Sequence, residues 1–172
     1  MRIHAPTPIL HGLIWGLTVS ILFGAAAHAG QVAVDDLAPA EKVQPELAKE
    51  LTHDLLSALR KIPNLAILSK PDIEAALELN PTLRPADCLP QNCFLETSSN
   101  FESEFIITGT LGRLGRKWIA SLTLTHLEHN TVVRQSTGAR TGDDSAAKDA
   151  VLNAVRNLFR EKIPAHLEGP RS

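Results

Sequence analysis

Residues 105–124 read FIITGTLGRLGRKWIASLTL, and this stretch decides the fold. Residues 104–111 are largely apolar and β-branched, which predicts a strand, and the glycine-rich residues 112–116 predict a turn. From residue 117 to 127, small polar side chains alternate with apolar ones. A period of two with one polar face is typical of an antiparallel strand that has one face open to water. The stretch therefore predicts a β-hairpin with one buried and one open face.

A third strand and a closing helix are expected after this hairpin. Residues 128–130 predict a turn, and residues 131–139 predict a strand that extends the hairpin into a meander. Residues 141–144 predict a loop, in which Asp143 and Asp144 are suited to cap a helix and to interact with its dipole. The apolar side chains of residues 147–163 then recur at helical spacing, which predicts an amphipathic helix.

The segment before the hairpin predicts a strand, a helix and a second strand. Residues 31–37 and 64–68 are short strands with apolar side chains on both faces. Between them, leucines repeat at helical spacing from Pro45, which suits the first helical position, to Ile62, and Pro63 ends the helix. A strand, a helix and a strand at this spacing predict a parallel pair with a right-handed crossover.

Two shorter helices are expected between the parallel pair and the meander. Ser69 followed by Asp72 resembles a capping box, which predicts a helix that begins there and ends near Leu79. A proline-rich loop over residues 80–92 and a brief helix over residues 93–100 complete the order. The chain is therefore expected to form an α/β fold with a single mixed sheet, in the order β-α-β-α-(α)-β-β-β-α.

The first thirty residues predict a cleaved secretion signal. A basic start is followed by an apolar run over residues 12–24, which is shorter than a membrane-spanning helix, and by the A-x-A pattern that ends at Ala29. We expect cleavage after Ala29, a folded domain over residues 30–163 and a flexible tail over residues 164–172. The alternative is an uncleaved membrane anchor, and no further segment is apolar enough to span a bilayer.

The composition argues against some partners and sets the context for two cysteines. The 17 basic and 19 acidic residues give a net charge of −2 without a basic cluster, which argues against a nucleic-acid partner. In an oxidising compartment, Cys88 and Cys93 are most simply a disulfide, which would stabilise the fold by at most about 2–3 kcal/mol. Free thiols and a metal site are the alternatives, but no further ligand lies nearby.

Three other patterns resemble chemical sites but have simpler interpretations. His126, Glu128 and His129 form a metal-like cluster, although two histidines at a strand end point to opposite faces unless the turn bends them together. We expect them to be solvated turn residues. Adjacent Asp35 and Asp36 could suggest paired carboxylates for acid/base chemistry, but adjacent strand residues face opposite ways. Solvation at the strand end, or capping of the loop that follows, is the simpler interpretation.

The third pattern is a series of glycines at residues 109, 112 and 115, which resembles a phosphate-binding loop. This series joins two strands and precedes no helix, so hairpin glycines with positive φ are the simpler interpretation. We therefore expect no catalytic residues, no metal ligands and no cofactor. His53, near the polar side of the first helix, is expected to be exposed.

Three segments carry a resemblance to a known family. They are AILSKPDIEAAL over residues 66–77, the two-cysteine loop from Cys88 to Cys93, and the hairpin over residues 105–124. Together they resemble the periplasmic domains that are similar to the amino-terminal domain of TolB. Curli-secretion CsgG-type domains and penicillin-binding-protein activators are similar in layout. The resemblance implies a TolB-like fold and a periplasmic domain for interaction or assembly.

The resulting expectation is a non-enzymatic, periplasmic protein-interaction domain of a Gram-negative cell envelope. The candidate contact regions are the exposed edge of the meander and the loop from Cys88 to Cys93, and the partner is an unidentified envelope protein. Two alternatives stay open from the sequence. One is a small secreted enzyme or ligand-binding protein, and the other is a subunit that self-associates into a ring.

Overall fold

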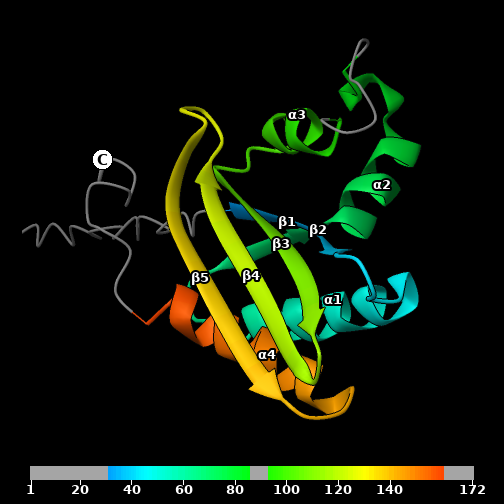
Figure 1. Cartoon of the computed structure of the whole chain (residues 1–172). Helices are drawn as coiled ribbons and strands as arrows, with labels where there is room; N and C mark the ends of the chain where they lie inside the picture. Colours follow the sequence, from blue (N-terminus) through cyan, green and yellow to red (C-terminus); the bar gives the residue numbers. More distant parts are fainter. Residues whose placement is uncertain (1–30, 86–92, 161–172) are drawn as a thin grey trace, which may run out of the picture.

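Five strands form one mixed sheet in the computed structural model, which describes residues 31–85 and 93–160 (Figure 1). The sheet order is β2-β1-β3-β4-β5. The elements are β1 (Gln31–Pro39), α1 (Pro45–Leu59), β2 (Ala66–Ser69), α2 (Lys70–Leu79), the 3₁₀ turn η1 (Pro81–Leu83), α3 (Cys93–Asn100), β3 (Phe105–Leu114), β4 (Lys117–His126), β5 (Thr131–Thr141) and α4 (Ser145–Leu158). The predicted α/β fold with a single mixed sheet is confirmed.

The pairing of the strands follows the order expected from the sequence. β1 lies parallel to β2 and also parallel to β3, which places it in the interior of the sheet. β3, β4 and β5 form the antiparallel meander. Because each parallel connection needs a crossover, α1 carries the chain from β1 to β2, and α2 and α3 carry it from β2 to β3.

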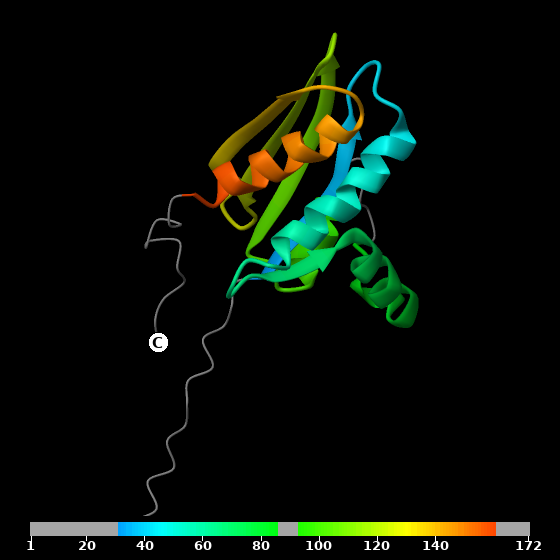
Figure 2. The same ribbon diagram turned by 90° about the horizontal axis from the view of Figure 1, so that it is seen from below.

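The core lies between one face of the sheet and the helices α1 and α4, which pack side by side (Figure 2). β4 shows the two-residue period clearly. Trp118, Ala120, Leu122 and Leu124 are buried, and the residues between them are only partly buried. The alternation predicted for this strand is therefore confirmed. On the other face, β1 contacts α2, and Ala33 and Ile106 are buried.

The hairpin differs from the prediction in the length of its turn. β3 runs to Leu114, which pairs with Lys117, so only Gly115 and Arg116 connect the two strands. Gly115 has a positive φ of 60°, as expected of a hairpin glycine, but Gly109 does not share this role. A Cβ atom on Gly109 would lie 2.6 Å from Leu37 Cδ2, so this glycine leaves room for the packing of that leucine.

Several predictions concern residues outside the described ranges. These are the signal peptide over residues 1–29, the tail over residues 164–172, and most of the loop that contains Cys88. Cys93 begins α3, but its disulfide with Cys88 stays a prediction because Cys88 is not described. Within the described part of the chain, no helix is long and apolar enough to span a membrane.

α2 begins with the capping box that the sequence predicted. Asp72 accepts hydrogen bonds from the backbone N–H of Ser69, at 2.9 Å, and from the Ser69 hydroxyl. These two bonds, above all the one from the hydroxyl, hold the pKa of Asp72 below its usual range. Arg60 lies 3.5 Å away and acts in the same direction.

We expect Asp72→Asn to lower the free energy of unfolding by about 1 kcal/mol at neutral pH. The effect stays small because the Asp72 side chain is 48% exposed. A carboxyl group whose pKa is lowered by folding stabilises the fold above its unfolded pKa, and this contribution disappears as the pH falls through the folded pKa. Urea unfolding at several pH values should therefore show the difference at pH 7 and lose it under acidic conditions. Glu74→Gln, in the same exposed turn, is the control and should show no such difference.

Candidate functional site

β5 forms one edge of the sheet, and it is the long edge. It spans 11 residues and pairs with β4 on one side only, whereas β2 at the opposite edge has 4 residues (Figure 1). An edge strand presents unpaired N–H and C=O groups to which another extended chain can bond. The exposed edge of the meander, a candidate contact region in the sequence, is therefore the strand β5.

The direction of the backbone groups along β5 can be assigned. In an antiparallel pair, successive residues direct their N–H and C=O groups alternately toward the partner strand and away from it. The carbonyl oxygen of Thr137 accepts a hydrogen bond of 3.0 Å from the Asn157 side-chain amide of α4, so Thr137 faces away from β4. By the same alternation, Gln135 and Ala139 also direct their backbone groups to the free edge.

α4 packs against β5 and thereby defines one wall of a pocket. Gly138 permits this approach, because a Cβ atom there would lie 2.0 Å from the Ala150 carbonyl oxygen. Ser136 and Arg134 of β5 then form hydrogen bonds with α4. The Ser136 hydroxyl donates to the Ala154 carbonyl at 2.8 Å, and the Arg134 guanidinium donates to the Leu158 carbonyl at 2.8 Å.

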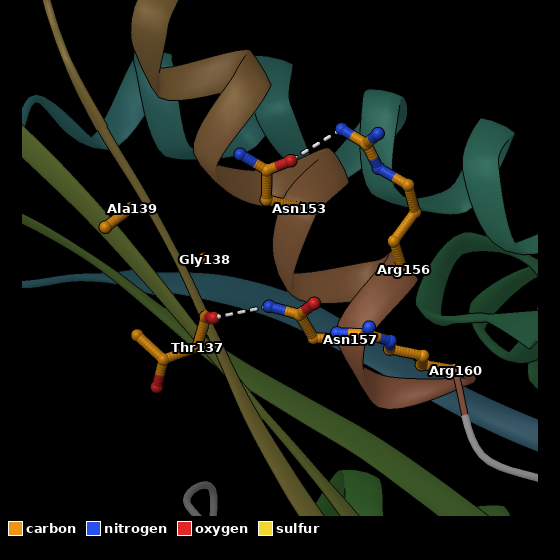
Figure 3. A pocket seen from close by; sticks show the side chains of 7 residues that line it. All are labelled: Thr137, Gly138, Ala139, Asn153, Arg156, Asn157 and Arg160. Carbon is orange, nitrogen blue, oxygen red and sulfur yellow. Dashed lines mark hydrogen bonds between the residues drawn. The ribbon is translucent and has the colours of Figure 1, made fainter.

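The pocket between β5 and α4 has a volume of 470 Å³ and a polar, basic lining (Figure 3). β5 contributes Thr137, Gly138 and Ala139, and α4 with the residues after it contributes Asn153, Arg156, Asn157 and Arg160. Arg156 donates a hydrogen bond to the Asn153 side chain. Among the described residues, no acidic group forms an ion pair with Arg156 or Arg160. We call this pocket and the free edge of β5 the β5–α4 groove.

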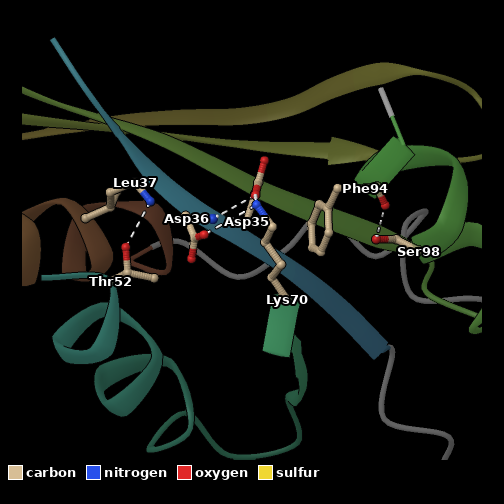
Figure 4. A network of polar contacts seen from close by, with 7 residues as sticks. All are labelled: Asp35, Asp36, Leu37, Thr52, Lys70, Phe94 and Ser98. Atoms are coloured by element: carbon tan, nitrogen blue, oxygen red, sulfur yellow. Dashed lines mark hydrogen bonds and ion pairs between the residues drawn. The ribbon is translucent and has the colours of Figure 1, made fainter. Parts of the chain in front are cut away.

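A second pocket lies on the open face of the sheet and is lined by hydroxyl groups. It has a volume of 230 Å³, and Thr108, Thr110, Ser121 and Thr123 line it together with parts of β1. A β-bulge after Val34 interrupts the β1 register here, and the N–H of Leu37 bonds to the Thr52 hydroxyl at 3.0 Å (Figure 4).

The bulge explains why Asp35 and Asp36 do not face opposite ways, whereas their expected solvation agrees with side chains that are 34% and 49% exposed. We expected adjacent strand residues to face opposite ways, but the extra residue of a bulge changes the local direction of the side chains. As a result, Lys70 Nζ lies 3.9 Å from an Asp35 oxygen and 3.4 Å from an Asp36 oxygen. One ammonium group thus pairs with both carboxylates and offsets one of their two negative charges.

The histidine cluster also differs from the expected arrangement, because His126 ends β4 and is buried, whereas Glu128 and His129 are exposed as expected of solvated turn residues. The turn after β4 brings His126 and His129 together, with ring centroids 4.6 Å apart and planes inclined by 10°. Together with Glu128 they offer ligand atoms within 4.8 Å of one another. The nitrogen lone pairs of an imidazole lie in its ring plane, so two nearly parallel rings do not converge on one ion. That this cluster binds no metal remains a prediction.

Two further expectations from the sequence can be compared with the structure. The side chain of Asp143, and not that of Asp144, binds the start of α4, because it accepts bonds from the Ser145 N–H and hydroxyl. These bonds hold the pKa of Asp143 below its usual range. Asp144 instead forms an ion pair of 3.2 Å with Arg113. His53 is exposed on α1, as expected.

The sequence analysis missed the basic part of the β5–α4 groove. Asn153, Arg156, Asn157 and Arg160 are spaced at i, i+3, i+4 and i+7, so they form one polar stripe along a helix. This spacing was visible in the sequence, but a polar stripe usually marks a solvated face. Here the stripe lies beside the edge strand β5 and lines a pocket with it.

Comparison with known proteins supports the fold. No family model and no curated protein match the chain. Among solved structures, the LpoB C-terminal domain from Escherichia coli aligns with a TM-score of 0.54 at 15% identity, over 69% of this chain and 87% of that domain. A PelC dodecamer from Paraburkholderia phytofirmans aligns with a TM-score of 0.55 at 17% identity, over 78% and 92% of the two chains.

A third similar structure is the lipoprotein GNA1162 from Neisseria meningitidis. It aligns with a TM-score of 0.52 at 10% identity, over 78% of this chain and 99% of that chain. These identities are low, so the three structures show a shared fold. They confirm the α/β fold that the resemblance in sequence implied.

Proposed function

We propose that this chain is a periplasmic protein-interaction domain of the cell envelope, exported by a signal at residues 1–29 that is cleaved after Ala29. In this proposal the domain performs no catalysis and contacts an envelope protein through the β5–α4 groove. The observation that carries the proposal is the free edge of the 11-residue strand β5, which lies beside a basic pocket. An open edge and a charged pocket suit recognition of another chain.

The similar structures support this proposal, because they share the fold and one of them is named as a lipoprotein. GNA1162 is a lipoprotein, and it shares nearly its whole length with this chain. The charge pattern also supports recognition by contact. The carboxylates of Asp35 and Asp36 share the ammonium group of Lys70, whereas Arg156 and Arg160 line the pocket without an ion pair to any described residue.

One alternative has a specific observation in its favour. The similar PelC structure is a dodecamer, and an open strand edge is a surface through which copies of one chain can pair. A self-assembling subunit of an envelope secretion system is therefore the second candidate. The 230 Å³ pocket on the open face keeps a ligand-binding protein as a third, less supported, candidate.

Site-specific photocrosslinking in the host cell tests the proposal. A photoreactive residue at Gln135, exposed on β5, is compared with one at Lys49, exposed on α1. We expect a crosslink to a different envelope protein from position 135 and none from position 49. A product formed by two copies of this chain would instead support self-assembly. Equal crosslinking from both positions, or none from either, would contradict the proposal.

The mature amino terminus tests the export part of the proposal. Signal peptidase cleaves directly after the last alanine of an A-x-A pattern, which here is Ala29. We therefore expect the chain recovered from the periplasm to begin at Gly30 when its intact mass is measured. An intact mass that still includes residues 1–29 would contradict cleavage and would favour the membrane anchor.

A further inference from the structure

We infer that the β5–α4 groove binds an extended, acidic peptide segment of its partner, which adds as a strand to β5 and places carboxylates at Arg156 and Arg160. This inference rests on the proposed function and gives the partner its chemistry. It combines two independent features of the groove. One is the direction of the backbone groups along β5, and the other is that the described residues that line the pocket include two arginines and no acidic side chain.

The backbone of β5 is arranged for strand addition. Gln135, Thr137 and Ala139 alternate along the free edge, so an incoming strand would meet outward N–H and C=O groups at every second residue. Asn157 donates its amide to the Thr137 carbonyl, the position that an N–H of an added strand would occupy. The Asn157 side chain therefore covers the edge when no partner is bound, and a peptide would displace it.

The charge of the pocket specifies an acidic peptide. Arg156 and Arg160 are four residues apart at the end of α4, and like charges at this spacing weakly oppose each other. Arg140 of β5, by contrast, has an acidic partner, because its guanidinium group lies 3.6 Å from the Asp149 carboxylate of α4. A guanidinium group binds a carboxylate through two parallel hydrogen bonds, so an acidic side chain of the peptide would satisfy both charge and geometry.

A second copy of β5 fits the groove less well. β5 contains Arg134 and Arg140 and no acidic residue. If two copies of β5 paired antiparallel about Thr137, Arg134 of each copy would lie opposite Arg140 of the other, because both are equally far from Thr137. Like charges directly opposite each other destabilise a strand pair. An acidic strand from a different protein removes this repulsion and supplies the missing charge.

Fluorescence anisotropy with the chain purified from the periplasm tests this inference. The probe is a short labelled peptide in which threonine alternates with glutamate, and the matched peptides carry glutamine or lysine at the same positions. We expect the glutamate peptide to bind about tenfold more tightly than the glutamine peptide near physiological salt. In the double variant R156E/R160E this order should reverse, so that the lysine peptide binds best.

Three further variants separate strand addition from simple attraction. Thr137→Pro removes an outward N–H from an edge strand, which tolerates proline, and should abolish binding without unfolding the domain. Asn157→Ala frees the Thr137 carbonyl and should keep or strengthen binding. The control K49E/K61E changes the net charge as much as R156E/R160E does, but on exposed residues away from the groove, and should leave binding unchanged.

The outcomes distinguish this inference from the proposed function. Equal binding of the three peptides would overturn the acidic partner, while a partner crosslinked from Gln135 would leave the interaction domain intact. If anionic phospholipid vesicles bind with the same dependence on Arg156 and Arg160, and Thr137→Pro has no effect, the groove recognises an anionic surface and strand addition is wrong. Loss of binding in Asn157→Ala would also contradict strand addition, because it would make that side chain a ligand.

Discussion

Gly138→Ala is expected to lower the free energy of unfolding by more than about 3 kcal/mol, because among the described glycines its added methyl group would make the shortest contact, and this contact is with backbone. The added Cβ would lie 2.0 Å from the Ala150 oxygen and 2.4 Å from the Ala154 nitrogen. Both atoms belong to the backbone of α4 and cannot rotate away as a side chain can. The helix must therefore move off the sheet, which would open the core around Val151 and Leu158.

Urea unfolding followed by circular dichroism measures this effect, and Gly112→Ala is its control. A Cβ at Gly112 would lie 3.7 Å from the Ala40 Cβ, which is an ordinary contact. Both glycines lie in strands, so the intrinsic cost or benefit of alanine is similar at the two positions. We expect Gly112→Ala to change stability by less than about 1 kcal/mol. Equal midpoints for the two variants would show that α4 does not pack on β5 as described.

The parts of the fold with a strong local signal were predictable from the sequence. The capping box of Ser69 and Asp72 specifies the start of α2 through its own hydrogen bonds, so the signal and the structure involve the same residues. The alternation along β4 is equally direct, because burial follows side-chain direction in a strand. In both cases the information lies within a few neighbouring residues.

Features that depend on the pairing of a strand with its neighbour could not be predicted from the local sequence. The bulge in β1 is a shift of register against β3, and nothing in Asp35 or Asp36 alone indicates it. Likewise, Gly112 resembled a turn residue, but it pairs with Ile119 because Gly115 and Arg116 suffice to connect the strands. A pairing partner decides each of these positions.

The β5–α4 groove also could not be predicted from the local sequence, because it depends on how two elements pack. The edge of the meander was identified from the sequence as a contact region, since the last strand of a meander often lies at an edge. The stripe that includes Arg156 and Arg160 has the spacing of a solvated helix face, and only the packing of α4 on Gly138 places it beside that edge. The groove therefore depends on a contact between two elements that the sequence identified separately.

Trp118→Ala is the second change for which we expect a large effect, a loss of about 3–5 kcal/mol in the free energy of unfolding. Trp118 is 1% exposed and lies on the face of β4 that packs against the helices. The Arg113 guanidinium carbon lies 4.7 Å from the centre of its ring, and Arg113 also pairs with Asp144, next to the start of α4. The indole thus fills the core and connects the hairpin to α4.

Two matched variants separate these contributions in the same urea experiment. Trp118→Phe keeps an aromatic ring and removes an indole N–H that has no hydrogen-bond partner among the described residues, so it should cost much less than alanine. Leu114→Ala removes a neighbouring side chain that is 74% exposed and should cost less than about 0.5 kcal/mol. Because the indole N–H is unpaired, its loss carries no penalty, and the difference between phenylalanine and alanine measures the filling of the core. If phenylalanine were as destabilising as alanine, the N–H would have to be bonded, and the packing around Trp118 would differ from that described.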